Sequence, residues 1–322
     1  MIADNLGKDF FGAHLFTTEN DIQLDIGKKG RSRLNIGKPT FKTKPPLEHD
    51  RTKTLQIDPA SFYLKALGIT TDAGTVRDKQ QDKWRQINKF IEILAGLFEK
   101  SALKDRKKLT IVDMGSGKGY LTFAAYDYFA NRRKIDVKIT GVDTKKELVG
   151  LCNDIAVATE FDRLRFVNSS IDEFDVANVD ILIALHACNT ATDDAIFKGI
   201  AAKAELIIVA PCCHQEIRPQ LRSPEMFKDI LKHGVMLERM AETFTDGLRS
   251  MLLERSSYST KLFEFVPTEH TPKNNMLVGT RLAKPANTSE IYSRIEQIKE
   301  LYGIKEQRLE TLLNSAPAQV TG

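Results

Sequence analysis

The chain has 322 residues, of which 42% are hydrophobic and 28% charged, and its formal net charge is +4. This composition is ordinary for a globular protein, and the length suits one large domain or two smaller ones. No apolar run reaches the roughly 18 residues of a membrane helix, and the four cysteines are too few for a disulfide framework. Because no secretory signal is recognisable either, we expect a soluble, cytoplasmic protein without membrane contact.

Residues 1–100 are expected to form a basic α+β extension that recognises the substrate. Cations predominate between Lys28 and Lys53, where only Glu48 and Asp50 oppose them. A second basic cluster precedes the first core strand and consists of Lys104, Arg106, Lys107 and Lys108. Such clusters suit RNA, because each neutralised phosphate releases counterions. The alternative is a solvated basic face without a partner.

Within this extension, residues 15–45 read as short strands or loops, because apolar and polar residues alternate between glycines and prolines. Residues 59–68 predict a short helix. A longer helix is predicted over 79–99, where apolar residues recur at three- and four-residue spacing from Trp84 to Leu97. This helix packs on another element, and we expect it to help residues 20–55 hold the substrate.

From Leu109 onward, strands and helices alternate. Strands are predicted at 109–115, 137–143, 164–170, 179–188 and 204–212, with helices at 118–131, 144–159 and 193–202. Aspartate is a common N-cap, so Asp193 is expected to cap the last of these helices. The alternation indicates βαβ units and a parallel sheet covered by helices.

The order changes after residue 220. Helices are predicted over 223–232 and 235–257, followed by strands at 261–267 and 275–283. The linker between these strands is too short for a helical crossover, so they should pair antiparallel. A seven-stranded, mostly parallel sheet that ends in an antiparallel hairpin is the Rossmann-like α/β layout of class I methyltransferases. We therefore expect a methyltransferase domain over 101–285 and a helical tail over 286–322.

A glycine-rich turn follows the first core strand. Asp113 ends the strand, and Gly115, Ser116, Gly117 and Gly119 follow. Glycines here let the backbone turn sharply and approach a ligand. The G-x-G-x-G spacing differs from the G-x-G-x-x-G fingerprint of dinucleotides, which disfavours a nicotinamide oxidoreductase. We predict that these residues bind S-adenosylmethionine (SAM), with Asp113 near its cationic end.

Further cofactor contacts are predicted at the ends of the next strands. Asp143 is placed to accept hydrogen bonds from both ribose hydroxyls, with Thr144 beside it. Its alternative role is to cap the following helix. Ser170 and Ile171 are placed to receive the adenine, and Leu185 ends the fourth strand. The carboxyl ends of parallel strands meet at one sheet edge, so these residues should share a site.

The catalytic candidates lie at the ends of the fourth and fifth strands. His186 could orient the substrate or act as a base near neutral pH, or it could simply bond to backbone beside the cofactor. Cys212 is a second candidate, as a thiolate nucleophile, and the alternative is a small packing residue. A zinc site would draw on five residues of this region, Cys188, Cys212, Cys213, His186 and His214, but adjacent cysteines are poor ligand spacing and no C-x-x-C exists, so no metal is expected.

The blocks DMGSGKGYL, ALHACNTATDDA and APCCHQE resemble a SAM-dependent methyltransferase family with many bacterial members. Its eukaryotic relatives are the methyltransferase-like twenty-five proteins, and the glutathione-S-transferase-C-terminal-domain-containing protein is also similar. The resemblance spans roughly residues 45–283 and implies a SAM-binding Rossmann-like core without fixing a substrate. This chain departs from the bacterial blocks at Asn189 and in the order CCHQ.

These observations together predict methyl transfer from SAM to a macromolecule, with tRNA or rRNA as the first choice. One alternative is methylation of a protein or a small molecule. The other is a non-catalytic RNA-binding protein that keeps only the fold. No N/D-P-P-Y/F tetrapeptide ends the fourth strand, which disfavours the usual exocyclic-amine methylation site.

Overall fold

The chain divides into two compact units, residues 1–54 and 55–322, in a computed structural model. The structure describes residues 5–27, 30–43, 55–185, 187, 189–265, 275–284 and 289–316. Within these ranges, no helix combines the length and the apolar character needed to cross a bilayer.

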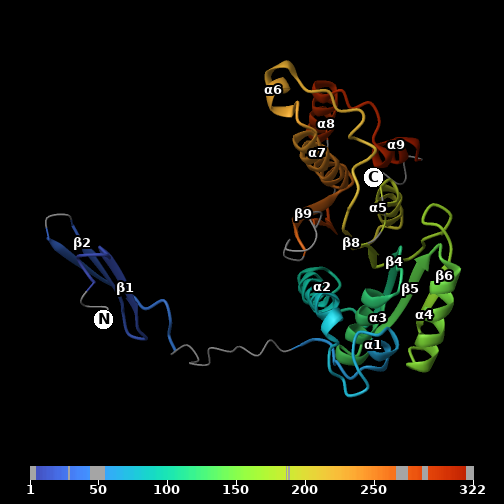
Figure 1. The fold of residues 1–322 in the computed structure, drawn as a ribbon, viewed down its shortest axis with the longest axis horizontal. Coiled ribbons are helices and arrows are strands. Elements are labelled where there is room, and N and C mark those ends of the chain that lie inside the picture. Colours follow the sequence, from blue (N-terminus) through green and yellow to red (C-terminus); the bar gives the residue numbers. More distant parts are fainter. Residues whose placement is uncertain are drawn as a thin grey trace. The chain divides into compact units, whose positions relative to one another are not determined.

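The first unit contains a three-stranded antiparallel sheet, coloured blue in Figure 1. Its strands are β1 (Gly12–Phe16), β2 (Asp21–Ile26) and β3 (Ser32–Gly37), in that order across the sheet. Leu15 faces Ile22, and Ile22 faces Ile36, so apolar side chains share one face. The region predicted as short strands or loops is thus one meander. Lys28, Lys29 and the cations of 44–54 lie outside the described residues.

The second unit is built on a seven-stranded sheet in the order β6-β5-β4-β7-β8-β10-β9. The strands are β4 (Lys108–Met114), β5 (Asp136–Asp143), β6 (Leu164–Asn168), β7 (Ile181–Ala184), β8 (Leu206–Val209), β9 (Tyr258–Glu264) and β10 (Asn275–Arg281). β4 to β8 are parallel, whereas β10 runs antiparallel to both β8 and β9. The predicted α/β class with its antiparallel end hairpin is therefore confirmed.

Helices cover both faces of this sheet, because alternate strand residues point to opposite sides. Ile111 and Ile139 belong to one apolar core, whereas Val112 and Val142 belong to the other. The first core takes side chains from α1 (Phe62–Ala66), α2 (Gln81–Lys100), α3 (Tyr120–Tyr126) and α4 (Lys146–Ala158). The second takes them from α5 (Ala191–Ala201), α7 (Gly234–Arg255), α8 (Ser289–Tyr302) and α9 (Arg308–Ser315), seen in Figure 1.

Short helical turns complete the second unit. They are the 3-10 turns η1 (Asp78–Gln80) and η3 (Glu225–Phe227), the π-helical turn η2 (Asp127–Arg132) and the one-turn helix α6 (Lys228–Leu231). The helix predicted over 223–232 is present as η3 followed directly by α6, so the helical residues are 225–231. Pro224 precedes the first turn, and α7 begins at Gly234.

Two segments that the sequence analysis set apart pack into this unit. The apolar stripe of α2 is buried in the first core, with Ile87, Phe90 and Leu94 fully covered. In the predicted tail, Ile295 of α8 and Leu309 of α9 are buried in the second core. An amphipathic helix becomes stable mainly by burying its apolar face, which explains why these helices join the sheet.

Candidate cofactor site

A glycine-rich turn joins β4 to α3 at the carboxyl edge of the parallel strands. Gly115, Gly117 and Gly119 have φ angles of 76°, 55° and 70°, in the left-handed region that favours glycine. The N–H groups of Gly115 and Ser116 donate to the carbonyl oxygen of Val142 at 2.8 and 3.0 Å. The turn is therefore fixed against the end of β5.

The glycines of this turn differ in what surrounds them. A Cβ on Gly119 would lie 3.0–3.1 Å from the rings of Phe166 and Phe123, so this position needs glycine for packing. A Cβ on Gly117 would meet no described atom within 4 Å. Gly117 thus borders open space. Gly119, predicted to bind the cofactor, is the N-cap of α3 and packs against an aromatic cluster.

Asp143 ends β5 and binds the same turn. Its Oδ2 accepts from the Gly117 N–H at 2.8 Å, and its Oδ1 accepts from the Lys145 N–H at 2.9 Å. A carboxylate oxygen has two lone pairs, so each oxygen keeps one acceptor site. The side chain is half-buried, and the N-cap position of α4 is Lys145.

Asp143 lines a cavity of about 410 Å³ at this edge of the sheet. Gly115, Gly117, Thr144, Ser170 and Ile171 line it as well, so it brings together six of the predicted cofactor residues. The volume falls within the roughly 300–1,000 Å³ of small-molecule sites. The mixture of backbone, carboxylate, hydroxyl and aliphatic groups suits a nucleoside.

A second cavity, of about 120 Å³, lies on the other side of Gly117 and is lined by Asp113 and Leu185. Asp113 is buried, and its Oδ2 accepts from the Thr122 hydroxyl at 2.6 Å. Burial raises the pKa of Asp113 to about 6, and nearby Asp143 adds to the rise, against the Thr122 hydrogen bond. A buried carboxylate in this position favours a cationic ligand group.

Lys83 of α2 also lines the smaller cavity, and the sequence analysis did not single it out. Its Nζ donates to Gln86 Oε1 at 2.6 Å and lies 5.3 Å from the centre of the Tyr120 ring. Burial lowers the pKa of Lys83 from its ordinary value. No local pattern links α2 to the glycine turn, so only the packing of α2 on the sheet reveals this cation.

The residues fit an adenosyl ligand on two further observations. Ser116 Oγ is buried and forms no hydrogen bond to any described residue, although it lines the smaller cavity. Such an atom costs about 1–3 kcal/mol unless a ligand or water satisfies it. The open space at Gly117 lies between the two cavities, where a ligand that spans both would pass.

Of the two catalytic candidates, the structure describes only Cys212. His186 and Cys188 lie outside the described residues. Cys212 is half-buried, with its Sγ 3.7 Å from Cys213 Sγ, and it lines neither of the two cavities described above. The roles of His186 and Cys212 therefore stay predictions.

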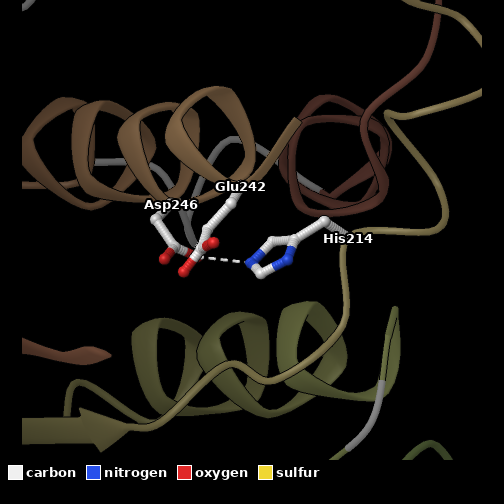
Figure 2. Close-up of side chains that lie close together, drawn as sticks. All are labelled: His214, Glu242 and Asp246. Carbon is white, nitrogen blue, oxygen red and sulfur yellow. Dashed lines mark ion pairs between the residues drawn. The ribbon is translucent and has the colours of Figure 1, made fainter. Parts of the chain in front are cut away.

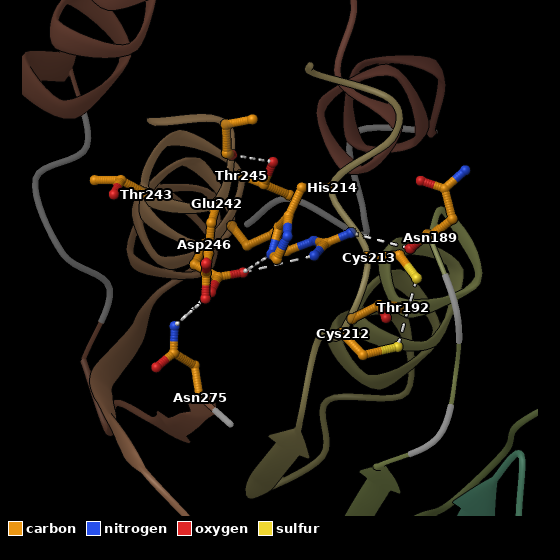
Figure 3. A network of polar contacts seen from close by, with 12 residues as sticks. Asn189, Thr192, Cys212, Cys213, His214, Glu242, Thr243, Thr245, Asp246 and Asn275 are labelled. Carbon is orange, nitrogen blue, oxygen red and sulfur yellow. Dashed lines mark hydrogen bonds and ion pairs between the residues drawn. The ribbon is translucent and has the colours of Figure 1, made fainter. Parts of the chain in front are cut away.

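The expectation that Asp193 caps its helix is wrong. This residue is not the N-cap of α5, which is Thr190, but a buried ion-pair partner. Its carboxylate accepts from Arg249 Nε at 3.0 Å and Nη2 at 2.6 Å, and from Gln307 at 2.6 Å. Arg249 Nη2 also donates to the Asn189 carbonyl at 3.0 Å, a bond drawn in Figure 3. Asp193 thus joins α5 to α7 and to the N-terminus of α9.

The strand order, the glycine turn after β4 and the carboxylate at the end of β5 define a class I methyltransferase domain, whose cofactor is SAM. Residues 82–220 match the family model described as a methyltransferase domain. The chain thus contains such a domain.

Curated relatives carry the name glutathione S-transferase C-terminal domain-containing protein. The Xenopus laevis protein is 23% identical over 222 residues, which are 62% of this chain and 34% of that protein. The human protein is 28% identical over 138 residues, 35% of this chain and 22% of that one. The chain spans about a third or less of the length of these relatives. The narrower assignment to a bacterial branch of the family stays a prediction.

Solved structures with a similar fold include two bacterial proteins. A ribosomal RNA methylase from Streptococcus thermophilus is 12% identical with a TM-score of 0.38, and the match covers 60% of this chain and 96% of that one. A putative class I SAM-dependent methyltransferase from Listeria monocytogenes is 14% identical with a TM-score of 0.39, covering 65% and 68%.

Proposed function

We propose that this chain transfers the methyl group of SAM to RNA. The observation that carries the methyl-transfer part is the junction of the glycine turn with Asp143 beside the 410 Å³ cavity. This junction offers a carboxylate to the ribose, and open space at Gly117 for the sulfonium group that links the ribose to the amino-acid end of the cofactor.

The proposed binding mode assigns each end of the cofactor to one cavity. Asp143 accepts from the ribose hydroxyls with its remaining lone pairs. Ile171 packs on the adenine ring, beside the hydroxyl of Ser170. In the smaller cavity, the Asp113 carboxylate attracts the ammonium group of the amino-acid end, and Lys83 attracts its carboxylate.

When bound, SAM supplies an electrophilic methyl group, which the acceptor atom takes by in-line displacement. The chain contributes chiefly by aligning the two reactants and excluding water. We propose His186, after β7, as the group that orients the acceptor or removes its proton. Cys212, after β8, is the alternative as a nucleophile on a pyrimidine ring.

RNA as the substrate rests on charge. Lys104, Arg106, Lys107 and Lys108 are all exposed, although Arg106 lies 3.4 Å from Asp180. They lie at the amino end of β4, and the length of this strand, about 20 Å, separates them from the glycine turn. We infer that they contact flanking phosphates of a folded RNA, while the target nucleotide enters at the carboxyl edge.

The test is tritiated methyl transfer from SAM to an extract of cells that lack this protein, separated into RNA, protein and small molecules. We expect label in RNA, and at least tenfold less with Asp143→Ala because the ribose loses its acceptor. Asp175→Ala, at an exposed position, is the matched control.

Label in protein or small molecules would redirect the proposal to those substrates. If SAM binds with normal affinity but no fraction is labelled, the chain is a non-catalytic protein that has kept the fold. Calorimetry with SAM separates these outcomes.

A further inference from the structure

A buried histidine lies just after β8, outside both cavities of the cofactor site. The side chain of His214 has 0% of its surface exposed. Neither Nδ1 nor Nε2 forms a hydrogen bond to any residue in the described part of the chain. Each buried nitrogen without a partner lowers the stability of the fold by about 1–3 kcal/mol. A bound ligand that contacts the ring would remove this penalty.

Two carboxylates of α7 face this histidine, as Figure 2 shows. Glu242 and Asp246 are four residues apart and therefore lie on one side of the helix. One nitrogen of His214 and one oxygen from each carboxylate lie within 4.8 Å of one another. Asp246 Oδ1, like the histidine ring, has no hydrogen-bond partner among the described groups.

The spacing is that of metal ligands rather than of a hydrogen bond. His214 Nε2 and Asp246 Oδ1 are 3.4 Å apart. An N–H···O hydrogen bond would bring them to about 2.7–3.2 Å. Two ligands of a tetrahedral Zn²⁺, each about 2.0–2.1 Å from the metal, stand about 3.4 Å apart. This pair already has the separation that such an ion requires.

The neighbouring groups hold the carboxylates in place. Asn275 of β10 directs its amide at both of them, to Asp246 Oδ2 at 3.1 Å and to Glu242 Oε1 at 3.4 Å, as seen in Figure 3. An amide that donates to carboxylate oxygens turned away from a metal is a common outer contact of metal sites. Oδ1 of Asp246 remains directed at His214.

The buried charges also favour a cation. The guanidinium of Arg249 binds Asp193 through two hydrogen bonds, and its Nη1 lies 3.8 Å from Asp246 Oδ1, beyond hydrogen-bond range. The single positive charge of Arg249 thus faces two fully buried aspartates, and half-buried Glu242 adds a further negative charge, so two negative charges remain. A protonated His214 would offset a single charge, whereas a divalent ion offsets both.

We propose that His214, Glu242 and Asp246 bind one divalent transition-metal ion of the Zn²⁺ class. Imidazole and carboxylate oxygens are ordinary ligands of such ions, and three protein ligands leave a fourth position for water or another small ligand. The ion joins the segment after β8 to α7. No metal was expected from the sequence, since the cysteine spacing was unsuitable and the carboxylates come from a separate helix.

The test uses the full chain, stripped with a chelator and titrated with Zn²⁺ by calorimetry. We expect one ion per chain, and a melting temperature that rises with Zn²⁺. Glu242→Gln and Asp246→Asn keep the side-chain shape, and each should weaken binding at least 100-fold and remove the rise. His233→Gln is the matched control, an exposed histidine at the start of α7.

Cys212 and Cys213 could bind zinc on their own, so Co²⁺ is the second probe. The proposed nitrogen and oxygen ligands give no thiolate-to-cobalt charge-transfer band. The proposal is overturned if that band appears and Cys212→Ser with Cys213→Ser abolishes binding, or if stripped wild-type protein binds no ion. Circular dichroism of each metal-free variant verifies folding, and equal binding by all folded variants would also overturn it.

Discussion

Asp113 and Asp143 end adjacent strands, yet their surroundings give them different chemistry. Asp143 is half-buried and bound by two backbone N–H groups. Asp113 is buried, with the Thr122 hydroxyl as its side-chain partner, and burial raises its pKa to about 6. The proposed ammonium site therefore titrates just below neutral pH, whereas the ribose site is held by backbone geometry.

This difference predicts a pH dependence of SAM affinity. The ionised form of Asp113 attracts the ammonium group, so affinity is present above pH 6 and is lost as the pH falls through it. Between pH 7 and pH 5 the ionised fraction drops about tenfold, and we expect a similar loss of affinity. Calorimetry in one buffer system measures it.

Asp113→Asn is the control for this prediction. Its affinity should be low and nearly independent of pH over the same interval. If wild type and variant change equally, another group is responsible and Asp113 does not bind the ammonium.

At the scale of elements, one aromatic ring determines how β5 and the glycine turn fit together. A Cβ on Gly141 of β5 would lie 2.5 Å from the ring of Phe166 and 3.0 Å from Ser116 Oγ. The same ring closes the space beside Gly119. Phe166 of β6 thus requires glycine at both positions, and the shape of the turn depends on a neighbouring strand.

We expect Gly141→Ala to lower the free energy of unfolding by about 1–3 kcal/mol, because the methyl group overfills a packed core. It should also weaken SAM binding by displacing Ser116. Gly150→Ala is the matched control, since a Cβ in this helical position meets no described atom within 4 Å. It should stabilise the protein by about 0.5–1 kcal/mol.

Urea unfolding of both variants gives these values. A Gly141→Ala protein as stable as wild type would mean that Phe166 moves aside freely and does not constrain the turn.

At the scale of the whole molecule, the proposed cofactor site and the basic cluster of 104–108 occupy opposite edges of the sheet, since one follows β4 and the other precedes it. Most other cations of the proposed RNA contact belong to the first unit, residues 1–54. Cofactor binding and RNA binding should therefore be separable.

We expect a chain of residues 55–322 to keep its SAM affinity, because the residues around both cavities belong to that unit. Its RNA affinity should fall. For the truncated chain, whose cluster of 104–108 supplies about four phosphate contacts, RNA affinity should drop on the order of 50-fold between 50 and 200 mM salt. The full chain should show a steeper slope in filter binding.

Full RNA affinity with an unchanged salt slope in the truncated chain would contradict a role for the first unit. Loss of SAM binding would instead show that the second unit needs the first for its own folding.

Sequence alone determined the features that arise from neighbours along the chain. The strand and helix periods predicted the parallel core, the short linker predicted the antiparallel pairing of β9 and β10, and glycine spacing located the turn at 115–119. Side-chain period and turn geometry are local properties, so they can be read without knowing what lies opposite.

Only the tertiary structure decided which distant groups meet. Lys83 reaches the smaller cavity because α2 packs on the sheet, and Asp193 pairs with Arg249 because α5 and α7 share a core. His214 meets Glu242 and Asp246 for a similar reason, across the segment between β8 and α7. Such contacts depend on how the helices pack on the sheet, and the spacing of residues along the sequence does not predict that packing.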